Sequence, residues 1–107
     1  MSREIDVRRD ALVDTIEIAF YLSEDNEAAA ERFSHAVVAA YERLAEMPTL
    51  GSLRDYGVPT LINVRAWPVP GFPNYLIFYE VQDEKIVILH VLHGARDLPT
   101  FFGSDHE

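Results

Sequence analysis

The sequence predicts an α+β fold, with an N-terminal strand and an α-helical hairpin packed on a small antiparallel β-sheet. Three observations lead to this prediction. In the first half of the chain, apolar residues recur at helical spacing over two adjacent segments. After residue 60 the apolar period shortens from about 3.6 to about 2 residues, which is typical of strands. The turns between the later strands are short, and short turns connect antiparallel neighbours.

The first part of the chain is expected to form a strand and then a helix. Residues 3–7 alternate polar and apolar side chains, as a half-buried strand does. The next segment, Asp10–Leu22, is expected to be an amphipathic helix with Asp14 and Glu17 on its solvent side. Its apolar residues at helical spacing are Leu12, Ile16, Ala19 and Phe20.

A second helix is expected from about Glu27 to Met47, where apolar residues again recur at steps of three and four. Asn26 precedes this helix and is a favoured N-cap residue. Pro48 ends it, because proline disfavours a helical conformation in the residue before it. The link between the two helices is short, so they are expected to form a hairpin.

Three strands are expected in the second half, over Leu61–Val69, Tyr75–Gln82 and Lys85–Leu92. Residues 70–74 contain prolines and a glycine, which are typical of a turn, and residues 83–84 make a tighter one. The last strand is apolar on both faces, which indicates a strand covered on both sides.

The composition is that of an ordinary soluble globular protein, with 49% hydrophobic and 25% charged residues. We expect residues 1–107 to form one domain. The sequence has no cysteine, which excludes disulfides, thiol nucleophiles and Cys-type zinc sites. No apolar run approaches the roughly 18 residues that a membrane span needs, and the charged N-terminus is unlike a signal peptide. A cytoplasmic location with no membrane partner is therefore expected.

The chain is acidic, with nine basic and eighteen acidic residues and a formal net charge of −9. The excess of acid is spread over both halves, and Lys85 is the single lysine. Tight binding to phosphate backbones requires clustered lysine and arginine. The charge therefore predicts no direct nucleic-acid partner.

The usual metal, nucleophile and nucleotide motifs are absent from the sequence. No two of the four histidines have the i, i+4 spacing of a metalloprotease helix. His90 and His93 would point to opposite faces of a regular strand. No serine lies in a nucleophile elbow, and no phosphate-binding glycine loop occurs. We expect neither a metal nor a cofactor.

The densest cluster of polar side chains lies at the end of the last strand, over His93–Asp97. Arg65 and Tyr79 on neighbouring strands can lie near it across an antiparallel sheet. Arginine, tyrosine and histidine together can hold a phosphate and transfer protons, which is the chemistry that cleaves RNA through its 2′-hydroxyl. In the alternative interpretation, one arginine pairs with a neighbouring carboxylate in a structural clamp.

Three segments of the second half resemble RelE/ParE-type bacterial toxins, most closely the ParE branch. They are Val64–Phe72, Tyr75–Tyr79 and Val91–Asp97, and the His-Gly-Ala-Arg-Asp run is the most specific element. Segments Ala28–Phe33 and Met47–Gly51 also fit the family pattern. The resemblance spans nearly the whole chain.

The resemblance implies the toxin of a type II toxin–antitoxin system, with a helical hairpin on an antiparallel sheet. It also implies a cognate antitoxin, whose C-terminal segment folds as it binds the toxin. ParE-like members of the family poison DNA gyrase without chemistry of their own. RelE-like members cut messenger RNA on the ribosome.

Two departures from RelE-like nucleases favour the ParE-like activity. Those nucleases are basic, and they commonly carry a catalytic tyrosine or histidine near the C-terminus, where this chain has Leu98–Phe102. His90 also stands where the family often has an arginine. We expect a protein-binding toxin with an antitoxin surface on the helical hairpin and an exposed sheet edge. The expected target-binding residues are Arg65, Trp67, His93, Arg96, Asp97, Phe101 and Phe102.

Two alternatives remain open on the sequence. In a RelE-like endoribonuclease, Arg65 and Arg96 would hold the scissile phosphate, and His93 or Tyr79 would transfer the proton. In an inactive homologue, the chain would be kept only as a binding partner.

Overall fold

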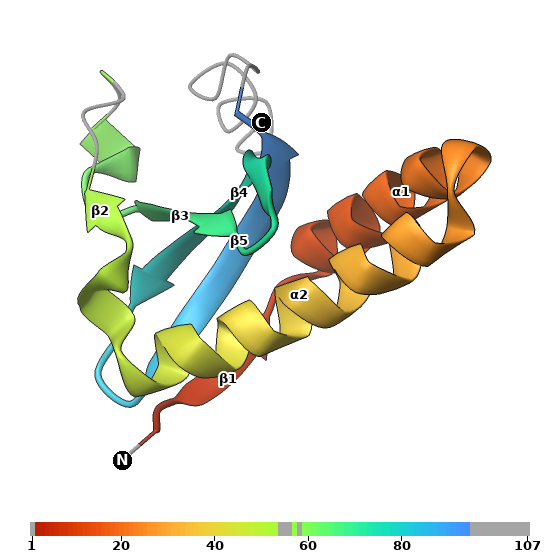
Figure 1. Ribbon diagram of the computed structural model, residues 1–107. Helices are drawn as coiled ribbons and strands as arrows, with labels where there is room; N and C mark the ends of the chain where they lie inside the picture. Colours follow the sequence, from red (N-terminus) through yellow and green to blue (C-terminus); the bar gives the residue numbers. More distant parts are fainter. Residues whose placement is uncertain (1, 54–56, 58, 95–107) are drawn as a thin grey trace.

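The computed structural model describes residues 2–53, 57 and 59–94, and Figure 1 shows two helices packed against a five-stranded sheet. The predicted α+β fold is confirmed. In chain order the elements are β1 (Glu4–Val7), α1 (Arg9–Asp25), α2 (Glu27–Glu46), the 3-10 turn η1 (Pro48–Leu50), β2 (Ser52–Leu53), the 3-10 turn η2 (Pro59–Leu61), β3 (Arg65–Val69), β4 (Phe72–Val81) and β5 (Lys85–His93).

The sheet is mixed, with the strand order β1-β5-β4-β3-β2. The β5–β4 and β4–β3 pairs are antiparallel, as predicted. β3 also pairs in antiparallel with the short strand β2, which the sequence did not predict. β1 instead pairs in parallel with β5, from Glu4 opposite Lys85 to Val7 opposite Ile88. The helical hairpin and three strands separate β1 from β5 along the chain, so no tight turn forces these two strands to be antiparallel.

The buried face of α2 lies at the centre of the larger hydrophobic core. The Asn26 side chain accepts a hydrogen bond from the Ala29 N–H at 3.2 Å, which confirms the expected N-cap. Of the six apolar residues that helical spacing places on one face of this helix, Ala30 is half-buried and five are buried, namely Phe33, Val37, Ala40, Tyr41 and Leu44. Ala45 is also buried, which the spacing did not predict. A smaller core on the other face of the sheet includes Leu61, Val64, Ala66, Leu76, Phe78 and Leu92. β5 contributes to both cores, as predicted.

Helix α1 turns a different face inward from the one its apolar spacing predicts. Asp14, expected on the solvent side, is 9% exposed, and Ala11 is fully buried. The apolar residues Leu12, Ile16 and Phe20 are exposed instead, by 53%, 68% and 70%. The prediction was wrong because a second set of residues at helical spacing, Ala11, Ile18 and Leu22, packs on the larger core. Asp14 lies on this inward face and makes buried polar contacts with β5.

Two strands begin three or more residues away from their predicted starts. β3 begins at Arg65 rather than Leu61, because η2 precedes it and Ile62 is exposed. β4 begins at Phe72, because only two residues separate β3 from β4. The second of them, Gly71, has a φ of +83°, a conformation that glycine adopts without strain. Among the described residues, neither helix is long and apolar enough to cross a membrane.

Candidate functional site

Arg65 and Tyr79 lie directly opposite each other on β3 and β4, and both contact the segment that follows α2. The Tyr79 hydroxyl donates to the Pro48 carbonyl at 2.6 Å and accepts from the Gly51 N–H at 2.8 Å. The Arg65 guanidinium donates from Nη1 to the Gly51 carbonyl at 2.6 Å. These three hydrogen bonds tie the segment from η1 to β2 onto the sheet.

Tyr79 can lie this close to residue 51 only because glycine has no side chain. A Cβ placed on Gly51 would lie 2.5 Å from the Tyr79 hydroxyl oxygen and 2.6 Å from its ring carbon Cε1. Contacts this short do not occur between real atoms, so no other residue fits without a shift of Tyr79 or of the backbone. Glycine at position 51 is thus required by packing rather than by its backbone dihedrals.

Tyr79 has the properties of a structural side chain. It is fully buried, and burial raises the pKa of its hydroxyl above 10.0, against smaller lowering effects of the Gly51 hydrogen bond and Arg65. A general acid or base works best with a pKa near the pH of the reaction. The Tyr79 hydroxyl therefore keeps its proton at neutral pH and holds the Pro48 and Gly51 backbone.

His93 lies at the far end of the same sheet, away from Arg65. It is exposed at the end of β5 and faces Tyr75, with the two ring centres 5.4 Å apart in an edge-to-face arrangement. Tyr75 precedes Tyr79 by four residues on β4, a separation of roughly 13 Å at about 3.3 Å per residue. The structure thus brings Arg65 and Tyr79 together but places His93 apart from both.

The other expected site residues fall into two groups. Trp67 on β3 is half-buried and packs against the larger core beside the helices. Arg96, Asp97, Phe101 and Phe102 lie outside the described residues.

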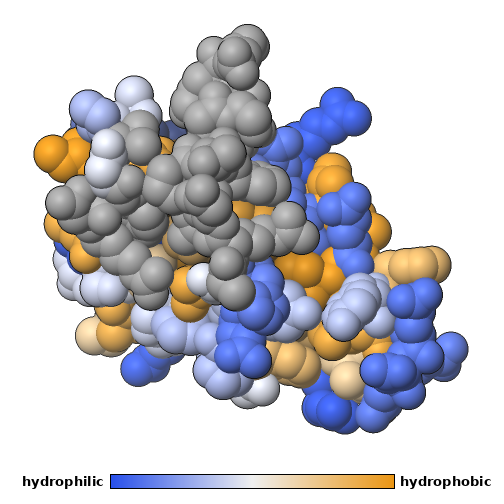
Figure 2. All heavy atoms as spheres, turned by 90° about the horizontal axis from the view of Figure 1, so that it is seen from above, coloured by the Kyte–Doolittle hydropathy of each residue, from blue (hydrophilic) through white to orange (hydrophobic). Residues whose placement is uncertain are grey.

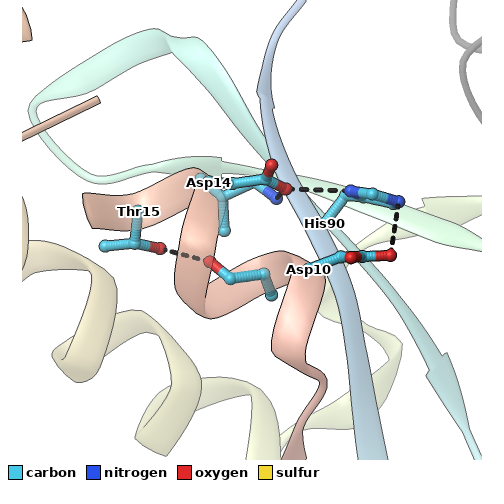
Figure 3. Close-up of polar contacts among 6 residues, drawn as sticks. Asp10, Asp14, Thr15 and His90 are labelled. Carbon is cyan, nitrogen blue, oxygen red and sulfur yellow. Dashed lines mark hydrogen bonds and ion pairs between the residues drawn. The ribbon is translucent and has the colours of Figure 1, made fainter. Parts of the chain in front are cut away.

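A buried polar cluster that the sequence did not predict joins α1 to β5. Figure 3 shows the Asp14 carboxylate and the His90 ring pointing toward each other, with Asp14 Oδ2 2.8 Å from His90 Nδ1. The same oxygen accepts the backbone N–H of Val91 at 3.0 Å. Asp10, one turn earlier, places Oδ2 3.9 Å from His90 Nε2. His90 is 4% exposed, so both of its ring nitrogens meet carboxylates in a nearly closed environment.

Among the described residues, this cluster lies just beyond the last residue pair between β1 and β5. β1 pairs with β5 only as far as Ile88, and Asp14 takes over the hydrogen bonding of Val91 beyond that point. The pairing of β4 with β5 also shifts register here, since Phe78 faces His90 but Tyr79 faces Ile88. The sequence contained two signals for this contact. Asp10 and Asp14 are one helical turn apart, and His90 is a polar residue within an apolar strand.

The described residues hold no group of three histidine, cysteine or acidic side chains placed to bind a metal ion. The hairpin carries two thirds of the net negative charge of the chain. Residues 9–46 contain three arginines and nine acidic residues, a net charge of −6 out of the total of −9. This acidic and partly apolar surface is suited to binding a protein.

The chain is similar to toxins of toxin–antitoxin systems. A family model described as "ParE toxin of type II toxin-antitoxin system, parDE" matches residues 5–98. A solved structure titled "Chromosomal ParDE TA system from P. aeruginosa" has a TM-score of 0.68 to this chain at 19% sequence identity. The match covers 86% of this chain and 96% of that one. No curated protein sequence matches the chain.

Proposed function

Because this chain belongs to the ParE family of toxins of type II toxin–antitoxin systems, we propose that it arrests bacterial growth by binding and poisoning DNA gyrase. The family implies an antitoxin partner, and we propose that a cognate antitoxin neutralises the toxin by folding onto it. Since gyrase acts on DNA inside the cell, the proposed site of action is the cytoplasm.

The observation that supports the proposal most strongly is that the Tyr79 hydroxyl is already hydrogen-bonded to the backbone. The hydroxyl is buried and holds the Pro48 and Gly51 backbone, so Arg65 has no proton-transfer group beside it on β4. His93 lies several residues away along the sheet. RNA cleavage through the 2′-hydroxyl needs phosphate-holding and proton-transfer groups within hydrogen-bond reach of one another. Among the described residues, the positions of Arg65, Tyr79 and His93 therefore favour a toxin that binds its target over one that cleaves RNA.

The proposed target surface begins at the end of β5. His93 is exposed there beside Tyr75, and aromatic and arginine side chains are enriched among the residues that dominate binding energy. Arg65 and Trp67 belong to the proposed surface on β3. Its remaining residues are Arg96, Asp97, Phe101 and Phe102, which follow His93 along the chain.

The proposed antitoxin surface is the helical hairpin together with an open sheet edge. β1 is an edge strand of the sheet, and an extended peptide can add to such an edge through backbone hydrogen bonds. The net charge of −6 on the hairpin favours a partner segment rich in lysine and arginine. The rate of association should then fall as salt is added, because screening weakens the attraction. A rate independent of salt would contradict this electrostatic part.

A test with purified components separates the proposed activity from RNA cleavage. The toxin is added to gyrase with plasmid DNA, and supercoiling and cleaved DNA are measured. A parallel reaction follows messenger cleavage on ribosomes. We expect loss of supercoiling and accumulation of cleaved DNA, both prevented by the antitoxin, with the messenger intact. Messenger cleavage without an effect on gyrase would overturn the proposal.

A pair of histidine variants tests the surface itself. His93→Ala should weaken gyrase inhibition, whereas His35→Ala, an exposed histidine on α2, should leave it unchanged. Equal inhibition by both variants would exclude His93 from the target surface.

A further inference from the structure

The outward face of α1 has apolar residues at its centre and opposite charges at its two ends. Arg9, Leu12, Ile16, Phe20 and Glu24 follow one another at steps of three and four, so they share one face of the helix. All five are exposed, and Ile16 and Phe20 are 68% and 70% exposed. Ala11 and Asp14 mark the opposite, buried face. Figure 2 shows hydrophobic residues reaching the surface among hydrophilic ones on the side where Figure 1 places the hairpin.

Two of the charges at the ends of α1, Arg9 and Glu24, do not suit the helix dipole, whereas Asp10 in the first turn does. Arg9 stands in the first turn and Glu24 in the last turn, which has no basic residue. The helix dipole favours the reverse arrangement, with acid at the N-terminus and base at the C-terminus. Within residues 2–53, 57 and 59–94, neither Arg9 nor Glu24 has an ion-pair partner. Their placement is therefore not explained by the stability of a single copy.

We propose that two copies of this chain associate through this face of α1, packed antiparallel about a two-fold axis at Ile16. Arg9 lies seven residues before Ile16 and Glu24 eight residues after it, about 10 and 12 Å along the helix at about 1.5 Å per residue. The axis therefore brings Arg9 of each copy to Glu24 of the other. Leu12, four residues before the axis, meets Phe20 of the second copy, four residues after it.

The face is self-complementary in three respects. Its centre is apolar, its two ends carry opposite charges at matching distances, and two antiparallel helix dipoles attract. A two-fold interface uses the same patch on both copies, which is the commonest arrangement in oligomers. One helix face is a small interface, so the association should be weak and depend on concentration. This inference does not rest on the gyrase target proposed above. The antitoxin is proposed to bind the same hairpin, so the dimer is proposed for the toxin that is free of antitoxin.

The test measures the mass of the full-length toxin without antitoxin by sedimentation over a range of concentrations, at about 0.15 M salt. The Debye length there is about 8 Å, so the general repulsion between two chains of charge −9 is largely screened. We expect a monomer–dimer equilibrium. Arg9→Glu alone and Glu24→Arg alone should each weaken dimerisation about tenfold or more, because like charges then meet at both ends of the interface.

Two rescue experiments separate this contact from a loss of folding. An equimolar mixture of the Arg9→Glu and Glu24→Arg chains should dimerise again, because each pair of facing residues then has opposite charges. The double variant should also dimerise. Both reversals favour the dipole of α1, so neither should unfold it. Arg32→Glu and Glu31→Arg on α2 carry the same charge changes at exposed positions and should dimerise like the original chain.

Three outcomes would overturn the inference. The first is a chain that stays monomeric at every concentration. A monomer whose α1 face is covered only by an added basic antitoxin segment counts as this outcome. The second is a dimer that both single reversals leave intact. The third is a mixture of the two reversed chains that fails to recover dimerisation.

Discussion

Asp14 on α1 and His90 on β5 lie 2.8 Å apart, between carboxylate Oδ2 and ring Nδ1, just beyond the last residue pair between β5 and its neighbour β1. The same carboxylate accepts a hydrogen bond from the Val91 N–H. One side chain of α1 therefore contacts both a side chain and the backbone of β5. A buried carboxylate is tolerated only where such partners surround it. The inward face of α1 thus combines this polar contact with the core packing of Ala11, Ile18 and Leu22, while its other apolar face remains on the surface.

Removing the Asp14 carboxylate should strongly destabilise the protein. In Asp14→Ala, the Val91 N–H and His90 lose their buried acceptor, and the free energy of unfolding should fall by about 3 kcal/mol. Urea unfolding followed by circular dichroism measures the change. Glu17→Ala, an exposed acidic position on the same helix, should alter stability by less than about 0.5 kcal/mol. Equal effects of the two substitutions would contradict the role given to Asp14.

Removing the Tyr79 hydroxyl should lower stability without abolishing toxicity. Tyr79→Phe leaves the Gly51 N–H without its buried acceptor and the Pro48 carbonyl without this donor, at a cost of about 1–3 kcal/mol. Chemical unfolding gives the stability, and growth after induced expression gives the toxicity. A variant that folds as stably as the original chain but no longer arrests growth would instead assign Tyr79 to the activity.

A side chain at position 51 should displace the segment between η1 and β2. Gly51→Ala places a methyl group within 2.5 Å of the Tyr79 hydroxyl oxygen, and the forced shift should cost about 1–3 kcal/mol. Thermal unfolding of the variant measures this loss. The matched control is Ser52→Ala at the next, exposed residue, which should unfold almost as the original chain does. An unchanged melting temperature for Gly51→Ala would show that the contact with Tyr79 is not tight.

Stability should fall between pH 10 and pH 12 because of Tyr41. Burial raises the pKa of this tyrosine from 10.0 to about 12, so the folded chain keeps a proton that the unfolded chain releases. The stabilisation is present below pH 10 and is lost as the pH rises through 12, by roughly 2.7 kcal/mol. Burial also raises the pKa values of Tyr75 and Tyr79, which act in the same direction.

Unfolding in urea at a series of pH values measures this slope, and Tyr41→Phe should reduce it. A slope that Tyr41→Phe does not alter would mean that Tyr41 titrates alike in the folded and unfolded chains.

The sequence predicted the elements whose apolar period coincides with burial. Helix α2 turns its periodic residues into the core, and the antiparallel strands follow their alternation and short turns. α1 departs from this rule because its most regular apolar face, including Ile16 and Phe20, points outward. The parallel pairing of β1 with β5 was not predicted, because no local pattern records a pairing between residues some 80 positions apart.

The candidate site was less predictable than the fold, because it depends on contacts distant in sequence. Facing strands bring Arg65 to Tyr79, but the sequence does not reveal that Gly51 and Pro48 already engage the tyrosine hydroxyl. His93 was grouped with them by residue type, whereas the register places it opposite Tyr75. The Asp14–His90 contact joins residues 76 positions apart and gives only a faint local signal.

The central claim, a ParE-family toxin that acts by binding gyrase, is tested most directly by induced expression in a bacterial host without antitoxin. Growth, DNA breakage and bulk translation are followed together after induction. We predict growth arrest with DNA breakage while translation continues. Arrest with rapid loss of translation and intact DNA would contradict gyrase poisoning and support messenger cleavage. Unimpaired growth with the folded protein present would contradict the toxic activity itself.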